Sequence, residues 1–174
     1  TSRDGTKAQH AAAFNRLVNP NVHKAMVELR DSGDTESWNN YISWSNNTFT
    51  AVYQQNANTL IKATQDKNYL IRWQGDRFEA FESAEGARNR ESVNSLTDEF
   101  GNRTGVLPQI PGDIRVAVQN MNGALESMKS IVKDNGLTMT DFVRNTYQGL
   151  PSSVFVPIGP APTIQGSGGT DQAK

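Results

Sequence analysis

The chain contains no cysteine, and this absence removes several kinds of chemistry at once. Disulfides, thiolate nucleophiles and cysteine-ligated zinc sites are excluded. The two histidines, His10 and His23, both lie near the N-terminus, so a catalytic triad or a two-histidine metal site would have to form in that one region. No Walker-type or dinucleotide-binding glycine loop is present. We therefore expect a protein that is not an enzyme and that holds no metal ion and no cofactor.

Long apolar runs are also missing. No segment approaches the ~20 apolar residues of a membrane span, and the first ten residues lack the apolar core of a signal peptide. We expect a soluble, unexported protein with no membrane contact. The 17 Lys+Arg residues balance 18 Asp+Glu residues, so nucleic-acid binding would depend on a local basic cluster and not on overall charge.

The chain does contain several segments with the residue pattern of amphipathic helices. A length of 174 residues suits one domain. Apolar residues recur at spacings of three and four over residues 7–30, 35–64 and 113–133. Proline should end one helix and begin another at Asn19-Pro20, and residues 45–48 favour a kink or two consecutive helices. The last of the three is the strongest, with Asp113 expected to cap its start and Gly136 its end. Its apolar positions form a heptad-like seam: Ile114, Val118, Met121, Leu125, Met128 and Val132.

The remaining segments have other patterns. Apolar residues alternate with other residues in the segment 68–81, on either side of the turn residues Gln74-Gly75-Asp76. This pattern predicts two short strands. Residues 82–100 predict a short helix that carries Val93, Leu96 and Phe100, and residues 140–147 predict another. Four of the seven prolines and a Gly-Ser-Gly-Gly run fall in residues 151–174, which we expect to be a flexible Pro/Gly-rich tail.

Four arginines surround the loop between the short helix and the long one. If these helices are antiparallel neighbours, the loop ends project together and the guanidinium groups converge, where they could bind phosphate bidentately. Asparagine and threonine beside them could contact sugars and bases. The alternative is a set of solvated arginines that pair with nearby carboxylates at Glu85, Glu91, Asp98 or Asp113. The four are Arg88, Arg90, Arg103 and Arg115.

Several stretches, in order, resemble the coat proteins of rod-shaped plant RNA viruses of the tobacco mosaic type. "IRWQGDRFEAF" (71–81) is similar to the family's short β segment, and "NTFTAVYQQNANTLIKAT" (47–64) to the junction between its two slewed helices. "SVNSLTDEFGNRTG" (92–105) looks like the end of the first radial helix, and "DIRVAVQNMNGALESMKSIV" (113–132) like the start of the second. The family's second arginine, two residues after the first, is Gly105 here.

This resemblance implies an antiparallel four-helix bundle in residues 35–150, with a small β element and an extra N-terminal helical segment at residues 7–30. It also implies a coat protein that self-assembles as a homo-oligomer into a helical rod and packages single-stranded RNA. Such a protein is found in the virion, and in the host-cell cytoplasm during assembly. By motif, Arg103 would contact RNA phosphate, Asn102 and Thr104 would flank it, and Asp113 would begin the long helix. Arg115, Arg88 and Arg90 complete the predicted RNA-binding set.

Two rivals remain at this stage. The chain could be a filamentous capsid subunit of another viral lineage that binds DNA. Alternatively, it could be a helical protein-interaction module without nucleic acid, in which the heptad seam docks a partner helix.

Overall fold

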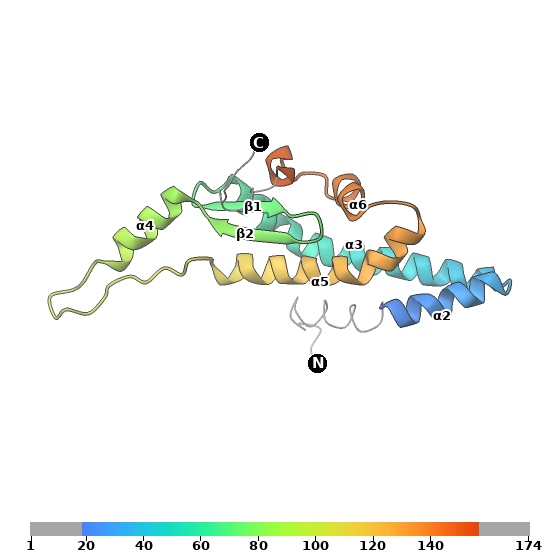
Figure 1. Cartoon of the computed structure of the whole chain (residues 1–174). Coiled ribbons are helices and arrows are strands. Elements are labelled where there is room, and N and C mark those ends of the chain that lie inside the picture. The colour runs from blue at the N-terminus through green and yellow to red at the C-terminus, as the bar shows by residue number, and fades with distance from the viewer. Residues whose placement is uncertain (1–18, 157–174) are drawn as a thin grey trace, which may run out of the picture.

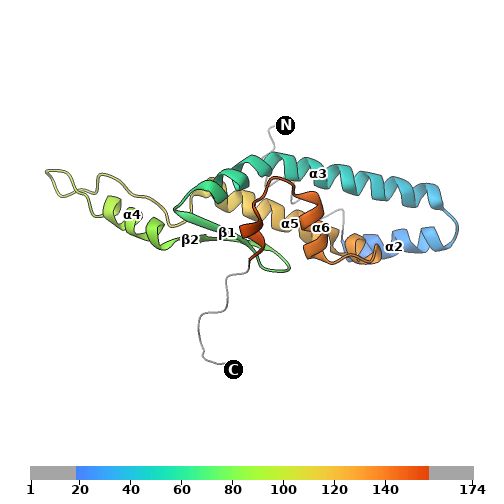
Figure 2. The ribbon, with the colours of Figure 1, turned by 90° about the horizontal axis from the view of Figure 1, so that it is seen from above.

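The protein is an elongated helical body from which one helix and its following loop project (Figures 1 and 2). The computed structural model describes residues 19–156. Two long helices run antiparallel, a third packs beside the first of them, and a two-stranded antiparallel sheet covers part of the long pair. In chain order the elements are α2 (Pro20–Asp31), α3 (Thr35–Gln65), β1 (Tyr69–Trp73), β2 (Phe78–Glu82), α4 (Ala84–Asn94), α5 (Gly112–Asp134), α6 (Met139–Thr146) and the 3-10 turn η1 (Ser152–Phe155).

The predicted helix start at Asn19-Pro20 is confirmed. Pro20 is the first residue of α2, where its missing amide proton costs no hydrogen bond, and the Asn19 side chain accepts from the amides of Asn21 and Val22. The part of the expected segment 7–30 that precedes this helix start lies outside the described residues.

Helix α3 runs without interruption through residues 45–48, so the prediction of two consecutive helices is wrong. Ser45 and Phe49 are buried, whereas Asn46 and Asn47 point to solvent. Packing of the buried side chains outweighs the weak helix propensity of this segment. The stretch likened to a junction between slewed helices is therefore the middle and end of one helix.

The heptad seam of α5 packs against α3 inside the same chain. All six of its apolar positions are buried, and the seam is therefore not free to dock a partner helix. Asn120 donates to the Asn56 side chain at 3.2 Å between the two helices, and Asn56 donates to the Val52 carbonyl at 2.7 Å. Asn122 holds β2 on α5, because it both donates to the Phe78 carbonyl and accepts from the Phe78 amide.

The predicted cap at the start of α5 is wrong, and the predicted cap at its end is confirmed. Asp113 lies inside the first turn, where its carboxylate accepts from the Ile114 amide, and Pro111 occupies the N-cap position without a side-chain hydrogen bond. Gly136 has φ of 76° and donates to the Lys133 carbonyl, as expected of a glycine that ends a helix.

The predicted tail begins too early. Residues 151–156 belong to the folded body, because Val154 is fully buried and η1 packs on β1. Pro151 directly precedes the 3-10 turn η1 and is therefore not the first residue of a flexible tail. Residues 157–174 lie outside the described part of the chain.

The mainly helical class with a small antiparallel sheet is confirmed. The antiparallel four-helix bundle is not confirmed: α2, α3 and α5 pack together and α6 packs on α5, whereas α4 projects beyond the ends of α3 and α5 (Figure 2). The short predicted helix also ends at Asn94 and not at Phe100.

Candidate functional site

The predicted binding residues lie on or beside one projecting feature, residues 83–111, which we call the arm. Helix α4 forms its outward limb, and the following loop returns to the start of α5 (Figure 1). None of its large apolar side chains is buried, so the arm has no core of its own. Its shape must depend on hydrogen bonds and on its attachment to the body.

Hydrogen bonds attach the base of the arm to the turn before β1. Ser83 accepts at its hydroxyl from the Gly86 amide, donates from the same hydroxyl to the Lys67 carbonyl at 2.6 Å, and donates its own amide to the Asn68 carbonyl at 2.9 Å. Asn89, one turn further along α4, donates to the Asn68 side chain at 2.9 Å. Gly86 passes so close to Asn68 that a Cβ atom at position 86 would collide with the Asn68 backbone.

A two-bond ion pair reinforces this base. Arg90 donates from Nε to one Glu82 carboxylate oxygen at 2.7 Å and from Nη2 to the other at 2.9 Å. The Glu82 side chain is only 6% exposed and the Arg90 side chain 26% exposed. Arg90 therefore joins α4 to β2, and its guanidinium group already has a carboxylate partner where the sequence predicted a phosphate contact.

The Glu82–Arg90 pair predicts a pH response of the arm. The hydrogen bond from Arg90 lowers the pKa of Glu82, so the pair's stabilisation is present above the ordinary glutamate pKa of about 4.3 and is lost as the pH falls through the lowered value. We expect the protection of α4 amides, taken relative to the intrinsic exchange rate at each pH, to fall in the wild-type protein as the pH drops through the lowered pKa of Glu82. In Glu82→Gln this protection should already be low at pH 7 and should depend less on pH; a protection profile of α4 identical to wild type would show that the pair does not hold the arm.

The return limb follows the end of α4 in the opposite direction. Arg103 pairs with Thr97 in an antiparallel bridge, and the Thr104 amide donates to the Leu96 carbonyl at 3.2 Å. Asn94 then clamps Leu107, accepting from its amide at 2.7 Å and donating to its carbonyl at 3.2 Å. The arm is thus closed into a narrow hairpin.

Asp98 organises the tip of this hairpin. Its carboxylate accepts from the amides of Phe100 and Asn102, both at 2.9 Å, and its own amide donates to the Asn102 carbonyl. The backbone hydrogen bond from Asn102 is the largest of the contributions that lower the pKa of Asp98. Gly101, with φ of 83°, supplies the left-handed residue that the turn requires. Asp98 is therefore a turn-forming residue, neither part of a helix face nor a partner of Arg103.

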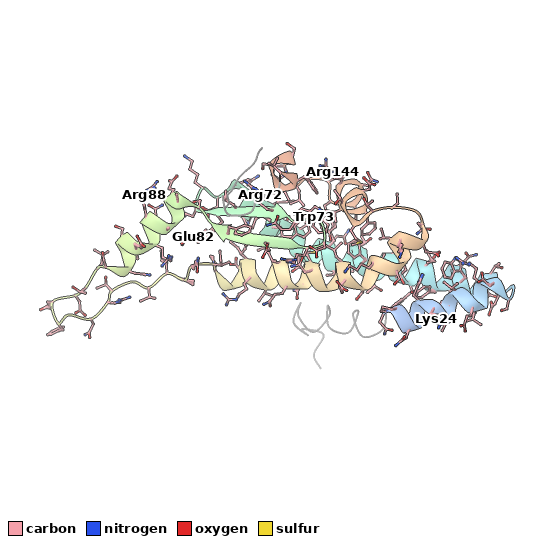
Figure 3. The ribbon with its side chains drawn as sticks, viewed as in Figure 1. Lys24, Arg72, Trp73, Glu82, Arg88 and Arg144 are labelled. Carbon is pink, nitrogen blue, oxygen red and sulfur yellow. The ribbon has the colours of Figure 1, made fainter. Side chains whose placement is uncertain are left out.

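The four arginines do not converge at one point. Arg103 lies in the loop beyond the end of α4, whereas Arg115 lies at the base, where it donates to the Ile110 carbonyl at 3.1 Å. Arg88 is exposed on α4 (Figure 3). Among the described residues, the side chains of Arg88 and Arg103 have no hydrogen-bond or ion-pair partner. The arm carries more acidic than basic groups, because four carboxylates stand against the three arginines Arg88, Arg90 and Arg103. The carboxylates are Glu85, Glu91, Asp98 and Glu99.

The other predicted contacts are solvent-facing. Asn102 and Thr104 are exposed beside Arg103, and Asp113 is exposed in the first turn of α5. Asp113 lines a hollow of about 430 Å³ at the root of the arm, together with Lys62, Asp66 and Tyr69. Burial, and then the charges of Asp66, Glu82 and Asp113, raise the pKa of Tyr69. With two carboxylates and one lysine in its lining, this hollow is poorly suited to phosphate.

Exposed apolar side chains on the arm were missed by sequence reasoning. They belong to Leu96 (55% exposed), Phe100 (80%), Val106 (66%) and Leu107 (46%). The helix expected over residues 82–100 would bury Leu96 and Phe100 on its apolar face. The two prolines after Leu107 indicated a loop but gave no sign that this loop leaves the body.

The described residues contain no cluster of three or more histidine or acidic side chains placed to hold a metal ion. Within residues 19–156 no helix is both long enough and apolar enough to cross a membrane. In comparisons with known proteins, no family model, no curated protein and no solved structure matches the chain.

Proposed function

We propose that the protein is a viral coat subunit that self-assembles into a helical rod and packages single-stranded RNA. The observation that carries this proposal is the arm, which presents large apolar side chains and two unpaired arginines to solvent on the same projecting hairpin. The order of sequence motifs resembling rod-virus coats supports the same reading. Assembly would take place in the host-cell cytoplasm and place the protein in the virion.

The exposed apolar side chains argue for self-association. Large exposed apolar side chains gathered on one feature can mark an interaction surface, and four of them lie on the arm, which has no core. Repeated copies of one chain would cover this surface without any other component. A near-neutral subunit also limits repulsion between neighbours in such an assembly.

The unpaired arginines argue for a polyanion that runs past the arm. Guanidinium groups bind phosphate oxygens in two-bond geometry, and Asn102 and Thr104 are placed beside Arg103 to contact sugar or base. Because the arm's acidic residues offset its arginines, each copy binds the polyanion weakly. Affinity then comes from the repetition of a few contacts along a continuous strand.

Replacing Arg103 with alanine should weaken RNA packaging without unfolding the protein. Loss of one phosphate contact per subunit should reduce the salt dependence of binding, that is, the slope of log K against log[salt], by about 0.7 for single-stranded RNA. The measurement is binding of a labelled single-stranded RNA at several salt concentrations, together with its protection from nuclease.

Arg77 is a suitable matched control, because it is exposed on the β1–β2 turn and pairs with Asp76 and Glu79, away from the arm. Arg77→Ala should leave binding unchanged. Equal losses in Arg103→Ala and Arg77→Ala would remove Arg103 from the site. Protection of DNA in place of RNA would instead favour the filamentous capsid subunit of another lineage.

A further inference from the structure

We propose that the arm of one copy docks in a groove at the far end of α5 on the next copy, so that subunits join head to tail. This inference rests on the proposed function, since it names the contact through which the subunits assemble. It commits to a second copy of this chain as the occupant of the groove.

The groove lies where α5 ends and the chain turns toward α6. A hollow of about 420 Å³ is lined by Lys129, Ser130, Val132, Lys133, Leu137 and Met139. A second hollow of about 520 Å³ shares Ser130 and Lys133 and extends to Lys24 on α2. Leu137 is 42% exposed, so the groove presents apolar surface at its end. Figure 3 shows Lys24 at the opposite end of the molecule from Arg88, which lies on the arm.

The two surfaces are complementary in charge and in polarity. The outer arm carries Asp98 and Glu99 beside the 80% exposed Phe100, whereas the groove carries Lys24 and Lys133 near apolar side chains. The third lysine of the groove, Lys129, pairs with Glu126, and its one carboxylate, Asp134, is paired with Arg30. Among the described residues, Lys24, Lys133 and Glu99 have no hydrogen-bond or ion-pair partner. An aromatic anchor in an apolar pocket with opposite charges at its rim is the usual arrangement of a specific interface.

An arm cannot reach the groove of its own chain. The 23 residues of α5 separate the base of the arm from the groove by about 34 Å, and the arm extends away from the body. The contact must therefore join two copies through different surfaces, and such heterologous contacts build rings or open filaments. Docking in the groove, unlike pairing of one arm with another, places Asp98 and Glu99 opposite lysines.

A mixing experiment with two blocked variants tests this contact. Phe100→Asp removes the anchor and leaves the groove intact, and Leu137→Asp places a negative charge in the groove and leaves the arm intact. Both positions are exposed, so far-UV circular dichroism should stay unchanged. Each variant alone should be monomeric in the absence of nucleic acid, with self-association weakened about 30-fold or more. An equimolar mixture should form 1:1 dimers that grow no further, as measured by light scattering after size exclusion.

Charge exchange provides a second, independent measurement. Glu99→Lys and Lys133→Glu should each weaken assembly, and the chain that carries both changes should recover it. If all of these variants form filaments as the wild type does, the head-to-tail contact is overturned. It is also overturned if the arm variants do not assemble while the groove variants assemble normally.

The proposed function fails separately from this inference. If the wild type forms protein filaments that depend on the arm and the groove but protect no RNA, the contact stands and the packaging role does not. If the particles protect RNA and tolerate Phe100→Asp and Leu137→Asp, the packaging role stands and the contact does not.

Discussion

Tyr147→Ala is expected to destabilise the folded body by about 3–5 kcal/mol. The Tyr147 ring is 2% exposed and stacks with three other rings, at centroid distances of 4.2 Å to Tyr53, 5.6 Å to Phe78 and 5.9 Å to Phe49. It therefore joins the end of α6 to both α3 and the hairpin. Its removal would leave a cavity where α6, α3 and the hairpin meet.

The Tyr147 prediction is measured by urea unfolding followed by circular dichroism. Tyr147→Phe is the matched control, since it keeps the ring and removes only a hydroxyl whose nearest partner is the Met121 sulfur at 3.9 Å. We expect this control to lie within about 1 kcal/mol of wild type. A loss below 1 kcal/mol in Tyr147→Ala would mean that the aromatic stack does not hold α6 to the body.

Gly86→Ala should loosen the arm from the body at a cost of about 2 kcal/mol or more, even though alanine favours a helix by ~1 kcal/mol over glycine. The added Cβ would collide with the Asn68 carbonyl group, which is backbone and cannot rotate away. The Ser83 and Asn89 hydrogen bonds to Asn68 would be strained together with it. The arm should then exchange its amides faster and lose its ability to assemble.

Gly112→Ala is the control for this substitution. The glycine at position 112 is also at the start of a helix, but a Cβ there would meet only the Arg115 guanidinium at an ordinary 3.7 Å. We expect Gly112→Ala to be as stable as wild type or slightly more stable. If both variants behave alike in α4 hydrogen exchange, the close approach of α4 to Asn68 is not what fixes the arm.

Sequence periodicity correctly predicted those elements in which the spacing of apolar residues within a single helix or strand is enough to identify the buried face. The seam of α5, the hairpin around Gln74-Gly75-Asp76 and the helix start at Pro20 are of this kind, because local pattern and tertiary packing agree there. The middle of α3 was different, since Ser45 is buried by packing against the rest of the fold and its neighbours' poor propensity misled the prediction.

The arm could be located from the sequence but its structure could not. Glycine and proline marked the loop, and the arginines drew attention to it. Whether Leu96 and Phe100 face a core or solvent depends on where α4 ends, and that end is set by Asn94 and Asp98, whose partners lie up to thirteen residues away. Likewise, the role of Arg90 follows from Glu82, which no local motif connects to it.

Electron microscopy of the purified protein with and without single-stranded RNA, followed by nuclease digestion, tests the central claim most directly. The account predicts helical rods that contain RNA and that keep a defined length of it intact under ribonuclease. It also predicts that Arg103→Ala rods protect less RNA at the same protein concentration. A protein that remains monomeric with RNA at all tested pH values and salt concentrations, and that leaves the RNA fully digestible, would contradict it.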